Sequence, residues 1–317
     1  MKPNGITGLS FIGLVQIGCL LVLVFSLAPF LSRLFWYLDL LSHFRFQYLV
    51  LSIFLTIGFL FFKNKVYLAM SVVGVLINSV FVIPVLTQTN NTSGELHQNS
   101  LKLFHANVLT SNNEYKKLIA QITEESPDII LLQEVDQQWV ASLAAIKSKY
   151  KFSIEVPRND NFGMALFSKI PIQEYQIHDW TDLEIPAIEA AFNLADQTLR
   201  IITTHPPPPV NKYYYDAGTA EFEAIASTMK GKEYASIVIG DLNTTIWSEQ
   251  YKTLESSTGL VNVSNGFGLI PTWPTNLIPL MIPIDHCLVS NHFNVINVKT
   301  GNDFGSDHLP LIVELGF

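Results

Sequence analysis

No charged residue occurs between Lys2 and Arg33, and this uncharged stretch constrains the fold more than any other feature of the chain. Within it, residues 6–30 form an apolar run long enough for the roughly 20 residues that cross a bilayer as a helix. Two more uncharged runs follow at residues 46–62 and 66–86, the former at the short end of the spanning range. We therefore expect a membrane region over residues 1–86 with three transmembrane helices.

Two other interpretations of these runs fit less well. A cleaved signal peptide would end in a small-residue cleavage site, which the first run lacks, and two further apolar runs follow it. Three buried helices of a soluble core would each be expected to keep a polar face. The membrane interpretation is therefore preferred.

The basic residues that flank the spans indicate an orientation. With three spans, Lys2, Lys63 and Lys65 lie on one side of the membrane, and Arg33 and Arg45 lie on the other side with the rest of the chain. Positive charge favours the cytoplasmic side of a bilayer. The excess of three against two therefore favours an extracytoplasmic C-terminal domain.

The segment after the spans differs from them in polarity and charge. Residues 87–100 (TQTNNTSGELHQNS) predict a polar linker that leads to a domain over residues 101–317. Residues 1–99 carry 5 Lys+Arg and 2 Asp+Glu, whereas residues 100–317 carry 14 and 25. So acidic a domain cannot hold nucleic acid through a broad basic surface, although a metal-assisted nuclease stays open. The two cysteines form no disulfide framework and show no zinc spacing.

Short apolar runs alternate with amphipathic segments from residue 101 onward. Residues 101–108 and 128–132 predict strands, and between them Tyr115, Leu118 and Ile122 recur at helical spacing. A second helix is expected around residues 222–229. Later strands are expected at 163–168, 187–194, 199–204, 236–239, 284–290, 293–299 and 309–315. Several lie too close together for a crossover helix, so antiparallel hairpins must be mixed in. We expect an α/β fold, a four-layer α/β sandwich of two packed mixed β-sheets flanked by helices.

Polar side chains recur where the apolar strands end. They are Asn107, Gln133, Glu134, His205, Asp241, Asn243, Asp285, His286, Asp307 and His308. In a packed sheet such ends converge on one rim, where a rigid scaffold commonly carries a site. His286 is expected to be structural, because neighbouring side chains on a strand point to opposite faces.

This set of side chains suits phosphoryl chemistry. A hard divalent cation such as Mg²⁺ takes oxygen ligands and keeps positions for water, so Glu134 with Asn107 or Asp307 could hold it. No soft ligand is needed.

The remaining members could serve the attacking water and the phosphate. An Asp that fixes the tautomer of a His can orient and deprotonate water, and Asp285 with His308 are the candidates. Asn243 and His205 could donate hydrogen bonds to phosphoryl oxygens.

Six ordered segments resemble the successive motifs of the endonuclease/exonuclease/phosphatase superfamily. They are FHANV, LLQEVD, TTHPPPP, IGDLN, IDHCLVS and GSDHLPL, and they cover roughly residues 101–317. Any one of them would be weak evidence, but six in this order are specific. The spans and the THPPPP and TWP segments look most like a membrane-anchored bacterial branch with teicoplanin-resistance-type and YafD-like proteins. That resemblance implies a multi-pass protein of the bacterial inner membrane.

The resemblance also implies roles for the metal site. Glu134 would be the principal ligand of Mg²⁺, with Mn²⁺ as an alternative ion, and Asn107 and Asp307 would complete or support the metal and phosphate site. Abasic-site nucleases of the superfamily carry an acidic residue two places after the first Asn. Leu109 stands there in this chain, which weakens a DNA-repair interpretation.

The same resemblance implies roles for the catalytic residues. Asp241 and Asn243 would position the nucleophilic water and the scissile phosphate, and His205 would contact a phosphoryl oxygen. His308, oriented by Asp285, would serve in acid–base catalysis or transition-state stabilisation.

Two segments bear on the substrate. Residues 269–284 are apolar and contain four prolines, which forbid a regular helix or central strand, and they run directly into Asp285. Residues 206–209 are four prolines, and Tyr213–Tyr215 follow them closely. An apolar and aromatic rim built from these segments would suit a lipid-linked phosphate better than a polynucleotide. Alternatively, both segments simply pack over the sheet.

The leading hypothesis is a membrane-anchored, Mg²⁺-dependent phosphohydrolase that acts on a phosphorylated small molecule or a lipid-linked, polyprenyl-type phosphate. One alternative is an extracytoplasmic metal-dependent endonuclease or exonuclease. An alternative of another class is a non-catalytic module that binds a phospholipid or a protein.

Overall fold

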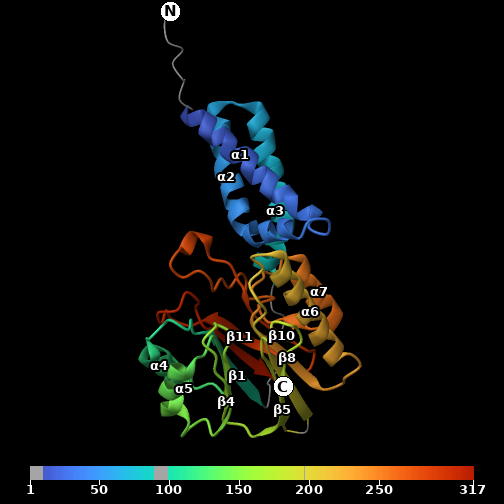
Figure 1. Ribbon diagram of the computed structural model, residues 1–317. Coiled ribbons are helices and arrows are strands. Elements are labelled where there is room, and N and C mark those ends of the chain that lie inside the picture. The colour runs from blue at the N-terminus through green and yellow to red at the C-terminus, as the bar shows by residue number, and fades with distance from the viewer. Residues whose placement is uncertain (1–9, 89–98, 196) are drawn as a thin grey trace, which may run out of the picture. The chain divides into compact units, whose positions relative to one another are not determined.

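The computed structural model describes residues 10–88, 99–195 and 197–317 (Figure 1). Contacts between residues divide the chain after Pro84 into two compact units. Each unit is considered by itself. Most of the predicted linker, residues 89–98, and the first residues of the predicted first span, residues 6–9, lie outside the described residues.

The N-terminal unit is a bundle of three apolar helices. They are α1 (Phe11–Leu27), α2 (Arg45–Phe62) and α3 (Lys65–Thr87), with the short 3-10 helices η1 (Ala28–Leu31) and η2 (Trp36–Phe44) between the first two. With these extensions all three are long and apolar enough to cross a membrane, as predicted. The second is longer than predicted because η2 leads directly into α2.

A small polar cluster lies inside this bundle. The Arg45 guanidinium donates to the backbone oxygen of Ser26 (2.6 Å) and lies over the Phe81 ring, 4.3 Å from its centroid. Asn78, on α3, donates to Ser26 Oγ (2.8 Å). All three polar residues are buried. A polar group inside a span is tolerated when neighbouring helices supply its partners, and these contacts do so for Asn78 and for one nitrogen of the Arg45 guanidinium, whereas Arg45 Nε is buried without a hydrogen-bond partner among the described residues.

The C-terminal unit contains two six-stranded sheets. The first has the order β11 (Asn294–Thr300), β12 (Leu311–Gly316), β1 (Ser100–Asn107), β2 (Ile129–Gln133), β4 (Met164–Ser168), β3 (Phe152–Val156). The second has the order β5 (Ile172–His178), β6 (Ala187–Leu194), β7 (Gln197–Thr203), β8 (Ala235–Asp241), β10 (Asp285–Val289), β9 (Val261–Asn262). The pairs β1–β2 and β7–β8 are parallel and the other pairs are antiparallel. Both sheets are therefore mixed.

Helices cover the outer face of each sheet. Helices α4 (Tyr115–Glu125) and α5 (Gln137–Leu143) pack on the first sheet, and α6 (Lys212–Met229) and α7 (Glu249–Thr258) pack on the second (Figure 1). The largest apolar cluster lies between the sheets and includes Cys287 and Met164. The predicted four-layer sandwich is confirmed.

Strand alternation decides which side chains reach the space between the sheets. On β1, Leu101 and Leu103 join the inter-sheet core, whereas Phe104 packs toward the helices. The period of two therefore places His105 and Asn107 on the inter-sheet side.

Pairing then brings the strand ends together. Parallel pairing sets Asn107 beside Gln133, and antiparallel pairing sets Asp285 opposite Asp241. The predicted polar residues at these ends therefore share one rim.

Five elements escaped the sequence analysis. Strands β3 and β5 are sheet edges that bury few side chains, so they lack a continuous apolar run. Strand β9 has two residues, and α5 and α7 bury only a few side chains each. Tyr213–Tyr215 lie in the first turns of α6 and not in a loop, because Asn211 caps the helix by accepting from Tyr214 N (2.9 Å).

Candidate active site

Glu134 is held at the rim by hydrogen bonds from the end of β1 and from the turn that follows it. Its Oε1 accepts from Asn107 Nδ2 (3.0 Å) and its Oε2 accepts from Thr110 N (3.2 Å). Its φ is +62°, a left-handed conformation that a non-glycine residue adopts at a cost and that is common at functional sites. The side chain is half-buried, so the carboxylate borders the solvent at the end of β2.

Asn107 connects two carboxylates. Its Nδ2 donates to Glu134 Oε1 and also to Asp241 Oδ2 (3.2 Å), while its Oδ1 accepts from Leu109 N (3.0 Å). The backbone contact fixes the orientation of the amide. Its nitrogen therefore faces the carboxylates, which makes Asn107 a residue that orients Glu134.

Asp241 Oδ2 is surrounded by nitrogen atoms. Besides Asn107 Nδ2, it lies 3.4 Å from His205 Nε2 and 3.6 Å from His308 Nε2. Its other oxygen, Oδ1, accepts from Asn243 N (2.9 Å). These partners come from the ends of β1 and β7, the turn after β8 and the turn before β12.

Asn243 is fixed in the turn that follows Asp241. Its φ is +51°, and its Nδ2 donates to the backbone oxygen of Pro206 (3.0 Å). This bond joins the turn after β8 to the first proline after His205. Pro206 and Pro207 are buried, so this part of the proline segment packs inside the domain and does not form an exposed rim.

Asp285 lies between two imidazoles. Its Oδ2 is 2.8 Å from His308 Nδ1, and its Oδ1 is 2.9 Å from His105 Nε2. The side chains of Asp285 and His105 are fully buried, and His308 is nearly so. With one imidazole on each oxygen, Asp285 is suited to orient His308.

The charged groups of Asp285, His308 and Asp241 stabilise one another. Burial opposes protonation of His308, but the carboxylates of Asp285 and Asp241 outweigh it and raise its pKa to about 10. Burial would raise the pKa of both carboxyl groups, yet His308, with His105 at Asp285 and His205 at Asp241, lowers it below its ordinary value. The pKa of His205 is raised because the nearby Asp241 outweighs burial. His308 is therefore an imidazolium at neutral pH in the protein alone.

Asp307 joins the site through the apolar segment before β10. Its Oδ2 accepts from Trp273 Nε1 (3.0 Å), and its backbone oxygen accepts from Thr275 N (2.9 Å). The Trp273 ring lies 6.3 Å from the His308 ring, centroid to centroid. Asp307 is half-buried, as Glu134 is.

Two groups of side chains at the site carry donor atoms for a hard divalent cation. Asp241, Asp285 and His308 each offer a ligand atom, and the three atoms lie within 4.8 Å of one another. However, both oxygens of Asp285 already face imidazoles. Glu134 and Asp307, which border solvent and carry oxygen donors, match the preference of Mg²⁺ better than that buried trio.

Two residues that contribute to this arrangement lacked an assigned role in the sequence analysis. One is His105, whose only signal was that it shares the strand face of Asn107. The other is Gln133, which donates from Nε2 to Thr204 O (2.6 Å) and accepts at Oε1 from Asp241 N (2.8 Å). Gln133 therefore ties the ends of the two sheets together.

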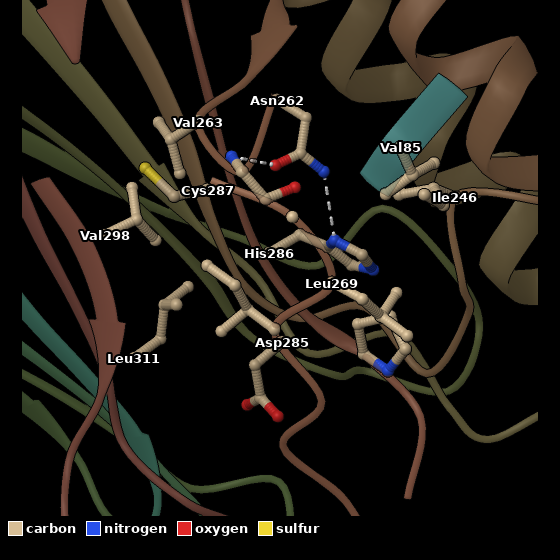
Figure 2. A pocket seen from close by; sticks show the side chains of 14 residues that line it. Val85, Ile246, Asn262, Val263, Leu269, Asp285, His286, Cys287, Val298 and Leu311 are labelled. Atoms are coloured by element: carbon tan, nitrogen blue, oxygen red, sulfur yellow. Dashed lines mark hydrogen bonds between the residues drawn. The ribbon is translucent and has the colours of Figure 1, made fainter. Parts of the chain in front are cut away.

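His286 lies outside the site, in agreement with the expectation from strand alternation. Figure 2 shows it pointing toward Asn262, away from the Asp285 carboxylate. Its Nε2 is 2.8 Å from Thr244 O and its Nδ1 is 3.3 Å from Asn262 Nδ2. It therefore anchors β10 to neighbouring segments of the second sheet.

Known proteins resemble the part of the chain that carries these residues. The model of the Endonuclease/Exonuclease/phosphatase family matches residues 100–308. No curated protein matches the chain in sequence.

Solved structures share the fold of the C-terminal unit. TDP2 of D. rerio, in complex with a single-strand DNA product, is 16% identical with a TM-score of 0.58, over 69% of this chain and all of its own. The catalytic domain of human Nocturnin, with a bound sulfate anion, is 20% identical with a TM-score of 0.57, over 69% of this chain and 94% of its own. An endonuclease/exonuclease/phosphatase protein from Beutenbergia cavernae DSM 12333 is 16% identical with a TM-score of 0.58, over 69% and 72%. At these identities the likeness shows the fold.

Proposed function

The chain belongs to the endonuclease/exonuclease/phosphatase family of metal-dependent phosphoester hydrolases, and from this premise we propose that it is a membrane-anchored, Mg²⁺-dependent phosphohydrolase of a lipid-linked phosphate. The bond cleaved would be a phosphate ester or anhydride. The observation that carries the proposal is the continuous set of contacts from Asp285 through His308 to Asp241 and from there through Asn107 to Glu134.

In this proposal the rim carboxylates take the metal. Glu134 and Asp307 would hold Mg²⁺, and Asn107 would keep the Glu134 carboxylate in place through the hydrogen bond at 3.0 Å. A cation held there would stabilise negative charge on the phosphoryl oxygens and lower the barrier to displacement of the leaving group by water. Mn²⁺ would fit the same oxygen donors.

The inner residues would handle the nucleophile and the transition state. Asp241, whose Oδ2 lies 3.4 Å from His205 Nε2 and 3.6 Å from His308 Nε2, would position the attacking water. His308, protonated at neutral pH, would donate to a phosphoryl oxygen as negative charge moves onto it, and Asp285 would keep its Nδ1–H in place. His205 and Asn243 lie beside the same carboxylate and would position the phosphate.

The surroundings of the site support a lipid-linked substrate. Residues 269–284 carry no charge, and Trp273 within them contacts Asp307. Residues 100–317 carry 14 basic against 25 acidic residues, an unfavourable balance for holding a polynucleotide. The three apolar helices would keep the domain near lipid substrates at a high effective concentration. The basic residues around the spans favour an extracytoplasmic domain, and the resemblance to the membrane-anchored bacterial branch would place it on a bacterial inner membrane.

A nuclease is the second candidate, because one structural neighbour was solved with a single-strand DNA product. Such an enzyme would rely on the metal and on contacts to few nucleotides. A non-catalytic module is disfavoured, because it would have no need of the contacts that join Glu134, Asp241 and His308.

An assay panel with the full chain in detergent tests the proposal. We expect Mg²⁺-dependent phosphate release from a polyprenyl diphosphate, abolished by EDTA and by Glu134→Gln. Nicking of plasmid DNA without release from any phosphorylated lipid would instead establish the nuclease. Inactivity on both substrates would refute the hydrolase assignment.

A further inference from the structure

An exposed apolar protrusion stands beside the site. Residues 274–281 (PTNLIPLM) carry no charge, and their outermost side chains are solvent-exposed: Leu277 (49%), Ile278 (75%) and Leu280 (43%). Exposed apolar side chains scattered singly are ordinary, but a cluster of them on one uncharged segment marks an interaction surface. We call residues 274–281 the apolar protrusion.

The apolar protrusion is ordered by its own hydrogen bonds. At its base Trp273 and Ile282 form a two-way bridge, with N to O distances of 3.2 and 2.6 Å. At its tip a 3-10 turn (Ile278–Leu280) is closed by Leu280 N donating to Leu277 O (2.8 Å). A segment that is already ordered loses little conformational entropy when it binds, which favours its use as a docking element.

The same base is joined to the site. Trp273 Nε1 donates to Asp307 Oδ2 (3.0 Å), and Thr275 Oγ1 donates to Ser306 O (3.0 Å). Thr272, directly before Trp273, accepts at Oγ1 from Asp285 N (3.4 Å). Whatever the protrusion binds is therefore placed at a fixed position relative to Asp307 and Asp285.

The short connection to the predicted spans indicates the bilayer as the partner of the apolar protrusion. Only twelve residues separate Thr87, the last residue of the third span, from Ser100, the first residue of β1. A chain of that length reaches at most about 45 Å when fully extended. The start of the domain therefore stays within that distance of the third span, where even a weak apolar contact with the bilayer is favoured by high effective concentration.

Charge excludes the other common way to hold a membrane surface. Polybasic segments bind anionic lipids, but residues 100–317 have 25 acidic and 14 basic residues. This balance favours contact through uncharged, apolar side chains, which partition into the headgroup region in proportion to their area.

We propose that Leu277, Ile278 and Leu280 insert into the interface of the bilayer that anchors the chain, and that this contact turns the rim with Glu134 and Asp307 toward the membrane surface. The inference concerns where the domain sits and does not depend on which phosphate bond is cleaved.

Site-directed fluorescence on the full chain tests the proposal. An Ile278→Cys variant is labelled with an environment-sensitive fluorophore and reconstituted in vesicles of phosphatidylethanolamine and phosphatidylglycerol, with or without lipids that carry a nitroxide quencher near the headgroup. Both native cysteines are buried and free, so labelling of the unsubstituted chain gives the background. The matched control is Tyr175→Cys, because Tyr175 is 60% exposed and lies on β5, which three strands separate from β10 in the same sheet.

We expect the quencher to lower the emission at position 278 by about twofold or more and to leave position 175 nearly unchanged, as shallow insertion requires. Equal quenching at both positions, or none at 278, would overturn the proposal. An apolar emission at 278 that depends on protein density and not on the quencher would also overturn it, in favour of contact with a second copy of the chain. Repeating the measurement with Glu134→Gln, where hydrolysis is expected to fail, should give the same quenching, which separates this inference from the proposed activity.

Discussion

Replacing His105 tests how the site is held together. His105 is fully buried and places Nε2 2.9 Å from Asp285 Oδ1, while the other Asp285 oxygen contacts His308. His105→Phe removes this hydrogen bond and keeps a ring of similar size on the same strand face. Asp285 then keeps only one of its two imidazole partners.

The expected cost in folding stability is small. A hydrogen bond to a charged group contributes about 1.5–3 kcal/mol, and its loss is the unfavourable part of the substitution. His105 Nδ1, however, is buried and has no hydrogen-bond partner, and leaving a polar atom in that state costs about 1–3 kcal/mol. Phenylalanine has no such atom, so the two contributions largely offset each other. We expect the free energy of unfolding to fall by about 1 kcal/mol or less.

The expected cost in activity is larger. Asp285 fixes the orientation of His308, and freeing one carboxylate oxygen lets both groups turn. Loss of a partner that orients a group at a metal site commonly lowers activity by about 10- to 100-fold, or about 1.4–2.8 kcal/mol. Because His105 touches no substrate, the loss should fall on kcat, with KM nearly unchanged.

The assay compares three variants by initial rates at saturating Mg²⁺ and by denaturant unfolding in detergent. His105→Gln can still donate to Asp285 and should recover most of kcat. His286→Phe is the matched control, because His286 is an equally buried histidine that bonds Thr244 O and lies outside the site. It should lose about 1–3 kcal/mol of stability with kcat nearly intact. A His105→Phe enzyme with normal kcat, or a His105→Gln enzyme no better than it, would refute the positioning role.

Three further predictions follow from the carboxylates and the raised pKa values. Glu134→Gln should lower turnover by about 10³-fold or more, since oxyanion and metal contacts contribute several kcal/mol, while far-UV circular dichroism stays unchanged; near-normal turnover would remove Glu134 from the metal site. The pKa of His308 is raised to about 10, so its contribution to stability is complete below pH 6.5 and is lost as the pH rises toward 10; in chelator the midpoint of unfolding should fall over that range, and it should fall less in His308→Gln, where the raised pKa of His205 still contributes. Burial raises the pKa of Glu221, which accepts from Thr204 Oγ1, to about 7. The folded protein thus favours the protonated carboxyl: its ionisation costs no stability at pH 4.5 and the full cost is reached above pH 7. Glu221→Gln removes this cost and should stabilise the protein by about 3 kcal/mol at pH 8 and hardly at all at pH 5; equal effects at both pH values would contradict the buried, titrating carboxyl.

Much of the fold and of the site's location is predictable because polar residues mark the ends of the apolar strands. Asn107, Asp241 and Asp285 each stand at the boundary of an apolar run, and the parallel pairs β1–β2 and β7–β8 deliver such boundaries to one edge. The three apolar spans are equally predictable, because a helix that crosses a bilayer must be both long and nearly uncharged.

Contacts between distant segments were not predictable in the same way. His105 meets Asp285 across 180 positions, and nothing local to either residue records the pairing. The strand period placed His105 on the same face as Asn107, but that face also carries Leu101 and Leu103, so an apolar environment was the simpler expectation. The edge strands β3 and β5 escaped for the opposite reason, because exposure on one side removes the apolar run that identifies a buried strand.

The carboxylates of the site have different hydrogen-bond partners, so residue type alone does not assign their roles. Asp285 has both oxygens facing imidazoles in a buried position, and Asp241 has one oxygen held by Asn243 N and the other among three side-chain nitrogens. A cation placed on Asp285 would have to displace a histidine and would repel the imidazolium of His308. Glu134 instead receives its hydrogen bonds from an amide and a backbone N–H, both neutral, at the border with solvent. Positive charge could therefore enter at Glu134 without opposing the charge already held inside. Under the proposed function, this electrostatic ordering, more than the identity of the residues, would place the metal at the rim and the protonated imidazole behind it.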